Sequence, residues 1–197
     1  MRARRCPHCS LLAVSVQNNA RAPENWPETV VYTQTLLFGS ACDEQLCMLT
    51  NGMFTRQTRI LGVDIREVPE DHASYGRGAT VNYGLYASRD WPVGEVVGEY
   101  TGQVRFSRDC SQSSSRYILQ FGKMGAVGHE PGLVIDAEKY GNETRFINHY
   151  AGIKSSPNVG FKLEDKDGHN AMVVKVLRRV RAGQELLIDY GPCFKPG

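Results

Sequence analysis

The chain has 197 residues, of which 41% are hydrophobic and 22% charged, and it contains 20 glycines. Such a composition indicates one turn-rich globular domain with a small appendage, and it excludes a coiled coil or a disordered tail. The net charge of +2 excludes a strong overall field for nucleic acid, so we expect nucleic-acid contact to be indirect at most. No apolar run approaches the roughly 18 residues of a membrane span, and we expect no membrane association.

Residues 1–57 are predicted to be an irregular lead-in, because their short apolar patches keep no sustained period. The first acidic residue is Glu24, so the opening stretch is basic. It is interpreted either as a weak organellar or nuclear address or as an unstructured start. From Arg59 the sequence is rich in residues that favour β-strands. This change predicts a domain over residues 58–191 and a short tail over residues 192–197.

Six cysteines lie scattered along the chain, without the dense spacing of a secreted disulfide scaffold. Reduced thiols are therefore expected. Cys6 and Cys9 have the spacing of half a zinc site, but no second close pair follows them. Free thiols are favoured over structural zinc, and no metal site is predicted.

Short strand candidates follow one another closely and predict a mainly β domain with little helix. They are Ile60–Ile65, Gly84–Ser88, Val96–Tyr100, Arg116–Phe121, Leu133–Asp136, Met172–Val176 and Glu185–Ile188. Loops are expected at Ser111–Ser115 and Glu164–His169. Ser111–Ser115 is interpreted as a solvated linker or, alternatively, as a phosphorylation target or a substrate-facing loop. The acidic run is interpreted as a solvent-exposed turn or, alternatively, as a site that attracts a basic peptide.

Three sequence blocks carry the most specific signal. The first is Gly141–His149, followed by Pro157 and Asn158, the second is Glu185–Gly191, and the third runs from Tyr83 through Gly98–Gly102. In this order and spacing they resemble the SET domain of protein-lysine methyltransferases, over about residues 60–191. The resemblance implies a mainly β SET-domain fold of several small curved β-sheets with few short helices. It also implies a C-terminal pseudoknot between the Asn148 segment and the end of the domain.

The resemblance implies S-adenosylmethionine (S-adenosyl-L-methionine) as the cofactor. This donor is a zwitterion, so its ammonium needs amide or carbonyl oxygens and its carboxylate needs a cation or N–H groups. The residues expected to bind it are Tyr83, Gly84, Tyr117, Arg145, Asn148, His149 and Tyr190. Of these, Tyr117 is the less specific match, and Arg145 is selected because its cation suits the carboxylate. Glycine at position 84 would let the backbone approach the cofactor closely.

Tyr190 and Tyr100 match the two active-site tyrosines of the family and are the expected catalytic residues. Taken singly, each would be interpreted as a core tyrosine with a satisfied hydroxyl. The substrate lysine has a solution pKa of about 10.4, so the site must help it lose its proton. Burial in a tyrosine-lined channel and a nearby sulfonium would both disfavour the charged amine.

Three departures from the family pattern qualify these expectations. Tyr150 and Ala151 replace the usual serine and cysteine, and residues 152–156 lengthen the next connection, which predicts a looser or specialised loop. Ile188 stands where many members carry phenylalanine or tyrosine, so more than one methyl group is expected to fit. A cysteine-rich zinc segment after the domain is not expected, because Cys193 alone follows Tyr190.

The function predicted is transfer of methyl groups from S-adenosylmethionine to a protein lysine, with a histone tail as the leading substrate and the nucleus as the leading location. A non-histone protein substrate, for which an organellar site or an exported effector is considered, is the first alternative. A non-catalytic SET-fold interaction module is the second. The target lysine and the oligomeric state are not predicted.

Overall fold

A computed structural model describes residues 22–38, 59–75, 82–107, 113–121, 132–166, 169–191 and 194 of the chain. These residues form a mainly β fold of several small sheets, with the 3-10 helix η2 (Glu143–Phe146) and no helix of seven or more residues. The strands are β1 (Val31–Tyr32), β2 (Leu37–Phe38), β3 (Val63–Glu67), β4 (Tyr83–Ala87), β5 (Val96–Glu99), β6 (Gln103–Phe106), β7 (Ile118–Phe121), β8 (Leu133–Asp136), β9 (Tyr140–Gly141), β10 (Asn148–His149), β11 (Val159–Lys166), β12 (His169–Val176) and β13 (Leu187–Ile188). The predicted fold class is confirmed. Within the described ranges, no helix is long and apolar enough to cross a membrane.

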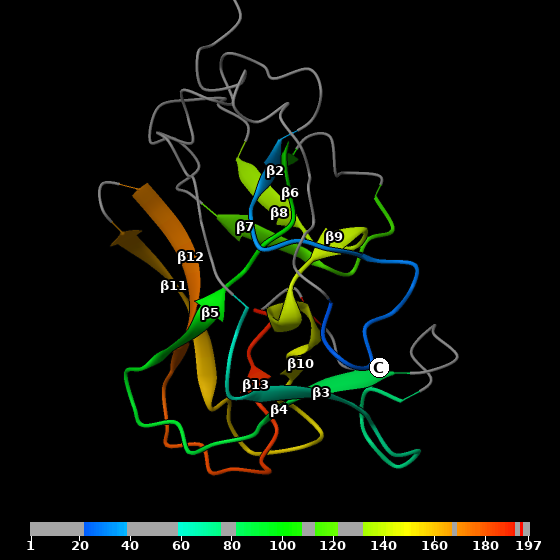
Figure 1. Ribbon diagram of the computed structural model, residues 1–197, viewed down its shortest axis with the longest axis vertical. Coiled ribbons are helices and arrows are strands. Elements are labelled where there is room, and N and C mark those ends of the chain that lie inside the picture. The colour runs from blue at the N-terminus through cyan, green and yellow to red at the C-terminus, as the bar shows by residue number, and fades with distance from the viewer. Residues whose placement is uncertain are drawn as a thin grey trace, which may run out of the picture.

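A long hairpin of β11 and β12 forms one three-stranded sheet, with β5 pairing antiparallel against β12 (Figure 1). The predicted loop over Glu164–His169 is wrong in extent, because β11 continues to Lys166 and β12 already begins at His169. Lys175 Nζ lies 2.6 Å from Glu164 Oε1 across the hairpin. This ion pair joins the two strands. Glu164 therefore lies within β11, where composition alone indicates a turn.

A four-stranded sheet in the order β2-β6-β8-β7 lies at the top of the view, beside the upper part of the β11–β12 hairpin (Figure 1). Its inner strand β8 is buried along its whole length, which explains the apolar run Leu133–Ile135. β2 pairs parallel with β6, and β1 pairs parallel with β9. Tyr32 and Leu36 from this early segment are each only 4% exposed. Residues 22–38 therefore pack on the rest of the fold as part of its sheets.

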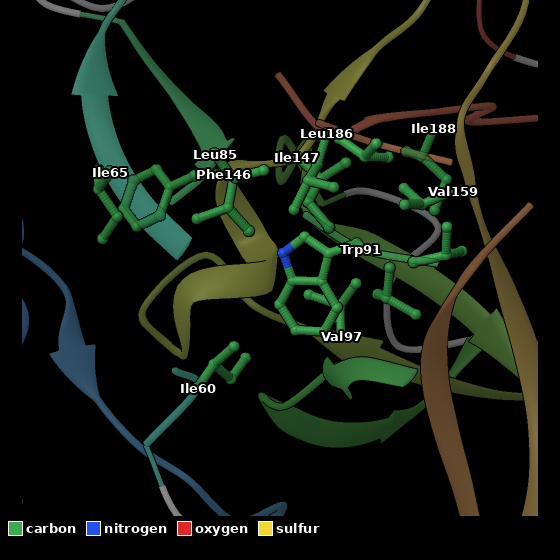
Figure 2. Close-up of a cluster of buried hydrophobic side chains, with 14 residues drawn as sticks. Ile60, Ile65, Leu85, Trp91, Val97, Phe146, Ile147, Val159, Leu186 and Ile188 are labelled. Carbon is green, nitrogen blue, oxygen red and sulfur yellow. The ribbon is translucent and has the colours of Figure 1, made fainter. Parts of the chain in front are cut away.

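The larger hydrophobic core lies where β3, β4, β5 and η2 meet the C-terminal strand β13 (Figure 2). Trp91 stands at its centre and is 2% exposed, and its indole Nε1 donates to the Gly62 carbonyl at 3.0 Å. Leu85, Leu186 and Ile188 pack in the same cluster. Since η2 contacts both β3 and β4, this core sets the position of the segment that leads into Asn148.

The strands β10 and β13 pair in parallel, with Asn148 opposite Leu187 and His149 opposite Ile188. Asn158 reinforces the pairing, because its Nδ2 donates to the Glu185 carbonyl at 2.8 Å and its Oδ1 accepts the Leu187 N–H at 2.7 Å. The two segments that the family resemblance predicts to be interlaced therefore lie against each other. They lie near the middle of the molecule in Figure 1.

The connection after β10 is a compact turn. The backbone N–H groups of Ile153 and Lys154 both donate to the Tyr150 carbonyl, at 3.0 and 2.9 Å. Gly152 has a φ of +86°, a conformation that a residue with a side chain rarely adopts. The longer connection between β10 and Pro157 is therefore closed by its own hydrogen bonds, and the looser loop suggested by its length is not found.

One buried carboxyl group makes the stability of this fold depend on pH. Glu143 in η2 is 2% exposed and accepts a hydrogen bond from Tyr32 Oη at 2.9 Å. Burial is the main cause that raises the pKa of the Glu143 carboxyl. A group whose pKa is higher in the folded state stabilises the fold below its unfolded pKa, and this contribution is lost as pH rises through the folded pKa.

We expect the free energy of unfolding of the wild type to fall, relative to that of Glu143→Gln, as pH rises from about 4.3. Urea unfolding of both proteins between pH 4 and pH 8 measures this difference. Glu24→Gln is the control, because Glu24 is exposed and lies in residues 22–38 with Tyr32. Its free energy of unfolding should change with pH as that of the wild type does. Parallel profiles for wild type and Glu143→Gln would contradict this account of the buried carboxyl.

Candidate active site

The C-terminal block brings Tyr190 back onto the residue before β10. Tyr190 Oη donates to the Ile147 carbonyl at 2.8 Å, and the Tyr190 backbone N–H donates to His149 Nδ1 at 3.1 Å. The Tyr190 residue is 42% exposed, so its ring borders solvent while its hydroxyl reaches inward. Because the hydroxyl hydrogen is already used on a carbonyl, Tyr190 Oη acts as an acceptor toward any further group.

Tyr100 and Tyr117 form the second part of this tyrosine cluster. Tyr100 is 7% exposed, and its hydroxyl donates to the Tyr117 carbonyl at 2.9 Å. Burial, followed by the nearby Tyr190, strongly raises the pKa of the Tyr100 hydroxyl. Tyr100 therefore stays protonated and neutral at physiological pH. The structure thus brings together Tyr100, Tyr117 and Tyr190, which come from three separate stretches of the sequence.

The amide of Asn148 has a defined orientation. Its Nδ2 donates to the Tyr83 carbonyl at 3.1 Å and to Glu185 Oε1 at 2.9 Å. Both partners are acceptors only, so the nitrogen must face them and Oδ1 must point the other way. No donor to Asn148 Oδ1 is found among the described residues. The side chain therefore presents a carbonyl oxygen that can accept a hydrogen bond from a ligand.

Gly84 lies beside this amide, and the structure gives a specific reason for the absence of a side chain. A Cβ built at Gly84 would lie 2.6 Å from Glu185 Oε1 and 3.2 Å from Asn148 Nδ2. The glycine therefore makes room for the Glu185 carboxylate. Tyr83 supplies its carbonyl to Asn148 and packs its ring against Phe146, with ring centroids 5.9 Å apart. Cofactor contact by Tyr83 and Gly84 stays a prediction.

The ring of His149 lies in an aromatic group rather than in open solvent. Its centroid is 4.7 Å from those of Tyr150 and Phe194 and 5.4 Å from that of Tyr190. Since Nδ1 accepts the Tyr190 N–H, the imidazole helps to hold the segment that carries Tyr190. Cofactor binding by His149 remains an expectation from the family resemblance.

Arg145 has contacts within the fold itself. The residue is 7% exposed, its Nε donates to the Ala137 carbonyl at 2.9 Å, and its Nη2 donates to the Glu138 carbonyl at 3.4 Å. Its guanidinium also lies over the Tyr117 ring, 4.1 Å from the centroid. These contacts tie η2 to the end of β8 and to the tyrosine cluster, and binding of a cofactor carboxylate by Arg145 stays a prediction.

Two residues near Asn148 were missed by the sequence analysis as members of the site. Glu185 accepts from Asn148 through Oε1, and its Oε2 lies 2.9 Å from His72 Nε2. The side chains of both His72 and Glu185 are 8% exposed. Glu185 stands in a block that was recognised, but no local pattern marks His72, because its partner is 113 residues away.

The described residues contain no group of three or more His, Cys, Asp or Glu side chains suited to a metal ion. All six cysteines, Cys6 and Cys9 included, lie outside the described residues. The expectations for zinc and for free thiols therefore stay as predictions.

Comparison with known proteins agrees with this arrangement. A family model described as SET domain matches residues 82–191. The chain is 32% identical over 126 residues to "Histone-lysine N-methyltransferase trithorax" of Drosophila virilis, which covers 64% of this chain and 3% of that protein. It is 32% identical over 117 residues to "Histone-lysine N-methyltransferase, H3 lysine-4 specific" of Emericella nidulans, covering 59% of this chain and 9% of that protein.

Solved structures share the fold. The crystal structure of ATXR5 in complex with mono-methylated histone H3.1 superposes with a TM-score of 0.62 at 14% identity, over 85% of each chain. The ATXR5 SET domain with di-methylated histone H3 gives a TM-score of 0.52 at 17% identity, over 66% of this chain and 57% of that one. The chain spans only 3% to 9% of the length of the two relatives compared above. With its motif blocks, its sheets and a family match over residues 82–191 in agreement, the chain belongs to the SET domain family.

Proposed function

We propose that this protein transfers methyl groups from S-adenosylmethionine to the side-chain amine of a protein lysine. The proposal rests mainly on the hydrogen bond of 2.8 Å that Tyr190 Oη donates to the Ile147 carbonyl. This bond leaves the Tyr190 oxygen as an acceptor near the buried Tyr100. The relatives named as histone-lysine N-methyltransferases support the same chemistry.

The residues around Asn148 fit the proposed cofactor. The amide oxygen of Asn148, oriented away from Tyr83 and Glu185, is a suitable acceptor for the ammonium of the methionine part. Arg145, His149, Gly84 and Tyr117 are the further candidates to line the same site. When bound, S-adenosylmethionine supplies an electrophilic methyl group on a sulfonium.

The tyrosine hydroxyls can orient a neutral amine without acting as a base. Burial keeps Tyr100 protonated, and its hydrogen is donated to the Tyr117 carbonyl. Tyr190 likewise donates to the Ile147 carbonyl. Both oxygens can therefore accept N–H hydrogens, which would direct the amine lone pair toward the methyl group. The lysine proton must pass to solvent beforehand, and burial of the amine favours that loss.

Methyl transfer from S-adenosylmethionine to a neutral amine needs no further reactant. With S-adenosylmethionine held beside Asn148, the lysine nitrogen would take the methyl carbon as the carbon–sulfur bond breaks, and the sulfur would leave as a neutral thioether. The methylated amine regains a positive charge from the donor. The contribution of the protein is therefore positioning and exclusion of water, which are large effects for reactions between two bound groups.

A histone tail is the proposed substrate and the nucleus the proposed location, because the relatives compared are named for histone lysine. The test is transfer of labelled methyl groups to a histone-peptide array, to intact histones and to cell extract. Labelling of histone peptides at lysine supports the proposal, and labelling of extract proteins alone would favour a non-histone substrate. Binding of S-adenosylmethionine with no transfer to any acceptor would favour the non-catalytic module.

Ile188 leads to a prediction about product multiplicity. This residue is 1% exposed, lies within the hydrophobic core and carries no hydroxyl. Because the side chain at position 188 has no hydroxyl, it cannot hydrogen-bond a monomethylated amine and so cannot prevent a second methyl transfer. We therefore expect mass spectrometry of a peptide at saturating donor to show dimethyl- or trimethyl-lysine. Accumulation of monomethyl-lysine alone would contradict this expectation.

A further inference from the structure

The loop that precedes the family-matched region presents one buried histidine to the Asn148 site. The loop turns at His72, whose N–H donates to the Pro69 carbonyl at 3.0 Å and whose carbonyl accepts the Tyr75 N–H at 2.8 Å. Its side chain is 8% exposed, which is unusual for a histidine in a surface loop. The family match begins at residue 82, so His72 lies outside it.

The hydrogen bonds of His72 define its tautomer. The backbone N–H of Ser74 donates to His72 Nδ1 at 3.1 Å, and a nitrogen that accepts carries no proton. The remaining ring proton must therefore lie on Nε2, which is 2.9 Å from Glu185 Oε2. His72 thus acts as a directed donor to one oxygen of the Glu185 carboxylate.

The other oxygen of Glu185 acts on Asn148. Glu185 Oε1 accepts from Asn148 Nδ2 at 2.9 Å, and it occupies the space that a Cβ at position 84 would fill. Burial, followed by the neighbouring Glu185, raises the pKa of the Tyr86 hydroxyl, which lies in the same cluster. The carboxylate is therefore held from the loop on one side and holds the Asn148 amide on the other.

We propose that His72 is a positioning residue that acts through Glu185 to keep Asn148 Oδ1 directed toward the S-adenosylmethionine ammonium. This inference rests on the proposed function for the identity of the ligand. Without the His72 donor, the Glu185 side chain can rotate or take up water, and the Asn148 amide loses a partner that defines its orientation. The consequence is weaker binding of the donor, with little change in the chemical step once the donor is bound.

A matched pair of substitutions separates the two hydrogen bonds of His72. In His72→Gln the amide nitrogen can take the place of Nε2 and still donate to Glu185. In His72→Asn the shorter side chain can accept from Ser74 but cannot reach Glu185. Asp71→Asn, at an exposed neighbour in the same loop, is the control. Calorimetric dissociation constants for S-adenosylmethionine and S-adenosylhomocysteine are the primary readout.

We expect His72→Asn to weaken binding of S-adenosylmethionine about 10-fold, which corresponds to one hydrogen bond to a charged group. His72→Gln should stay within about threefold of wild type, and Asp71→Asn should bind as wild type does. Where transfer is measured, KM for the donor should rise while kcat changes less than about twofold. S-adenosylhomocysteine keeps the ammonium, so its affinity should fall in parallel.

Equal binding by folded His72→Asn and wild type would overturn the proposal, as would equal weakening in His72→Gln. A second measurement needs no substitution: nitrogen-15 spectra of labelled histidine should show His72 protonated at Nε2, and protonation at Nδ1 would overturn it. Because the readout is binding, a wild type that binds the donor but transfers nothing contradicts the proposed function and leaves this inference standing. A wild type that binds neither ligand overturns both.

Discussion

Replacing Tyr190 by phenylalanine is expected to lower the rate of methyl transfer by about 100-fold or more, the range for removal of one positioned polar group in a transition state. The substitution removes an oxygen that donates to the Ile147 carbonyl at 2.8 Å and that would otherwise accept from the amine. The ring contacts with His149 and Phe194 do not involve the hydroxyl and should remain. Steady-state transfer to a lysine peptide measures the effect.

Tyr75→Phe is the matched control, because Tyr75 is 41% exposed and Tyr190 is 42% exposed, and both substitutions remove one oxygen. Tyr75→Phe should keep the activity of the wild type. Thermal unfolding of both variants should stay close to that of the wild type, which separates lost chemistry from lost fold. Unchanged transfer by Tyr190→Phe would show that another residue orients the amine.

Truncation of Leu85 to alanine is expected to lower the free energy of unfolding by about 2–5 kcal/mol, the usual cost of a large cavity in a packed core. Leu85 is 0% exposed and packs in the cluster around Trp91 (Figure 2). A small domain is stable by only about 5–15 kcal/mol, so this one change removes a large fraction of its stability. Urea unfolding monitored by tryptophan fluorescence measures the loss.

Leu61→Ala supplies the control with the same chemistry, because Leu61 is 75% exposed. It should change the free energy of unfolding by less than about 0.5 kcal/mol. A loss at Leu85 no larger than that at Leu61 would mean that β4 does not contribute to the core as described.

The sequence predicted strands that are rich in apolar, β-branched or aromatic residues. β8, buried along its length, is the clearest case. β11 was missed because four of its eight residues, Lys162, Glu164, Asp165 and Lys166, are charged, which is a composition depleted in strands, and because it also contains Gly160. The structure explains the glycine by packing, since a Cβ there would lie 2.9 Å from Leu177 Cδ1. The two-residue strands β1 and β9 depend on partners far along the chain, which no local period can predict.

The candidate site was predictable to the extent that it lies in the motif blocks. Asn148 and Tyr190 were selected from the sequence, and the structure pairs β10, which contains Asn148, with β13, which ends two residues before Tyr190. The roles of Glu185 and His72 were not predictable, because they arise from a contact between a loop and a block that are far apart in sequence. Arg145 shows the converse: a cation chosen for its charge has contacts with carbonyls and an aromatic ring.

The parallel pairing of β10 with β13 has a consequence for synthesis on the ribosome. Residues 147–149 emerge about 40 residues before their partners, so a nascent chain halted between them contains β10 but lacks the strand that pairs with it. Contacts so distant in sequence form late and slow the last step of folding. We expect nascent chains arrested before residue 187 has left the exit tunnel to be sensitive to protease around residues 147–149, and later arrests to be protected.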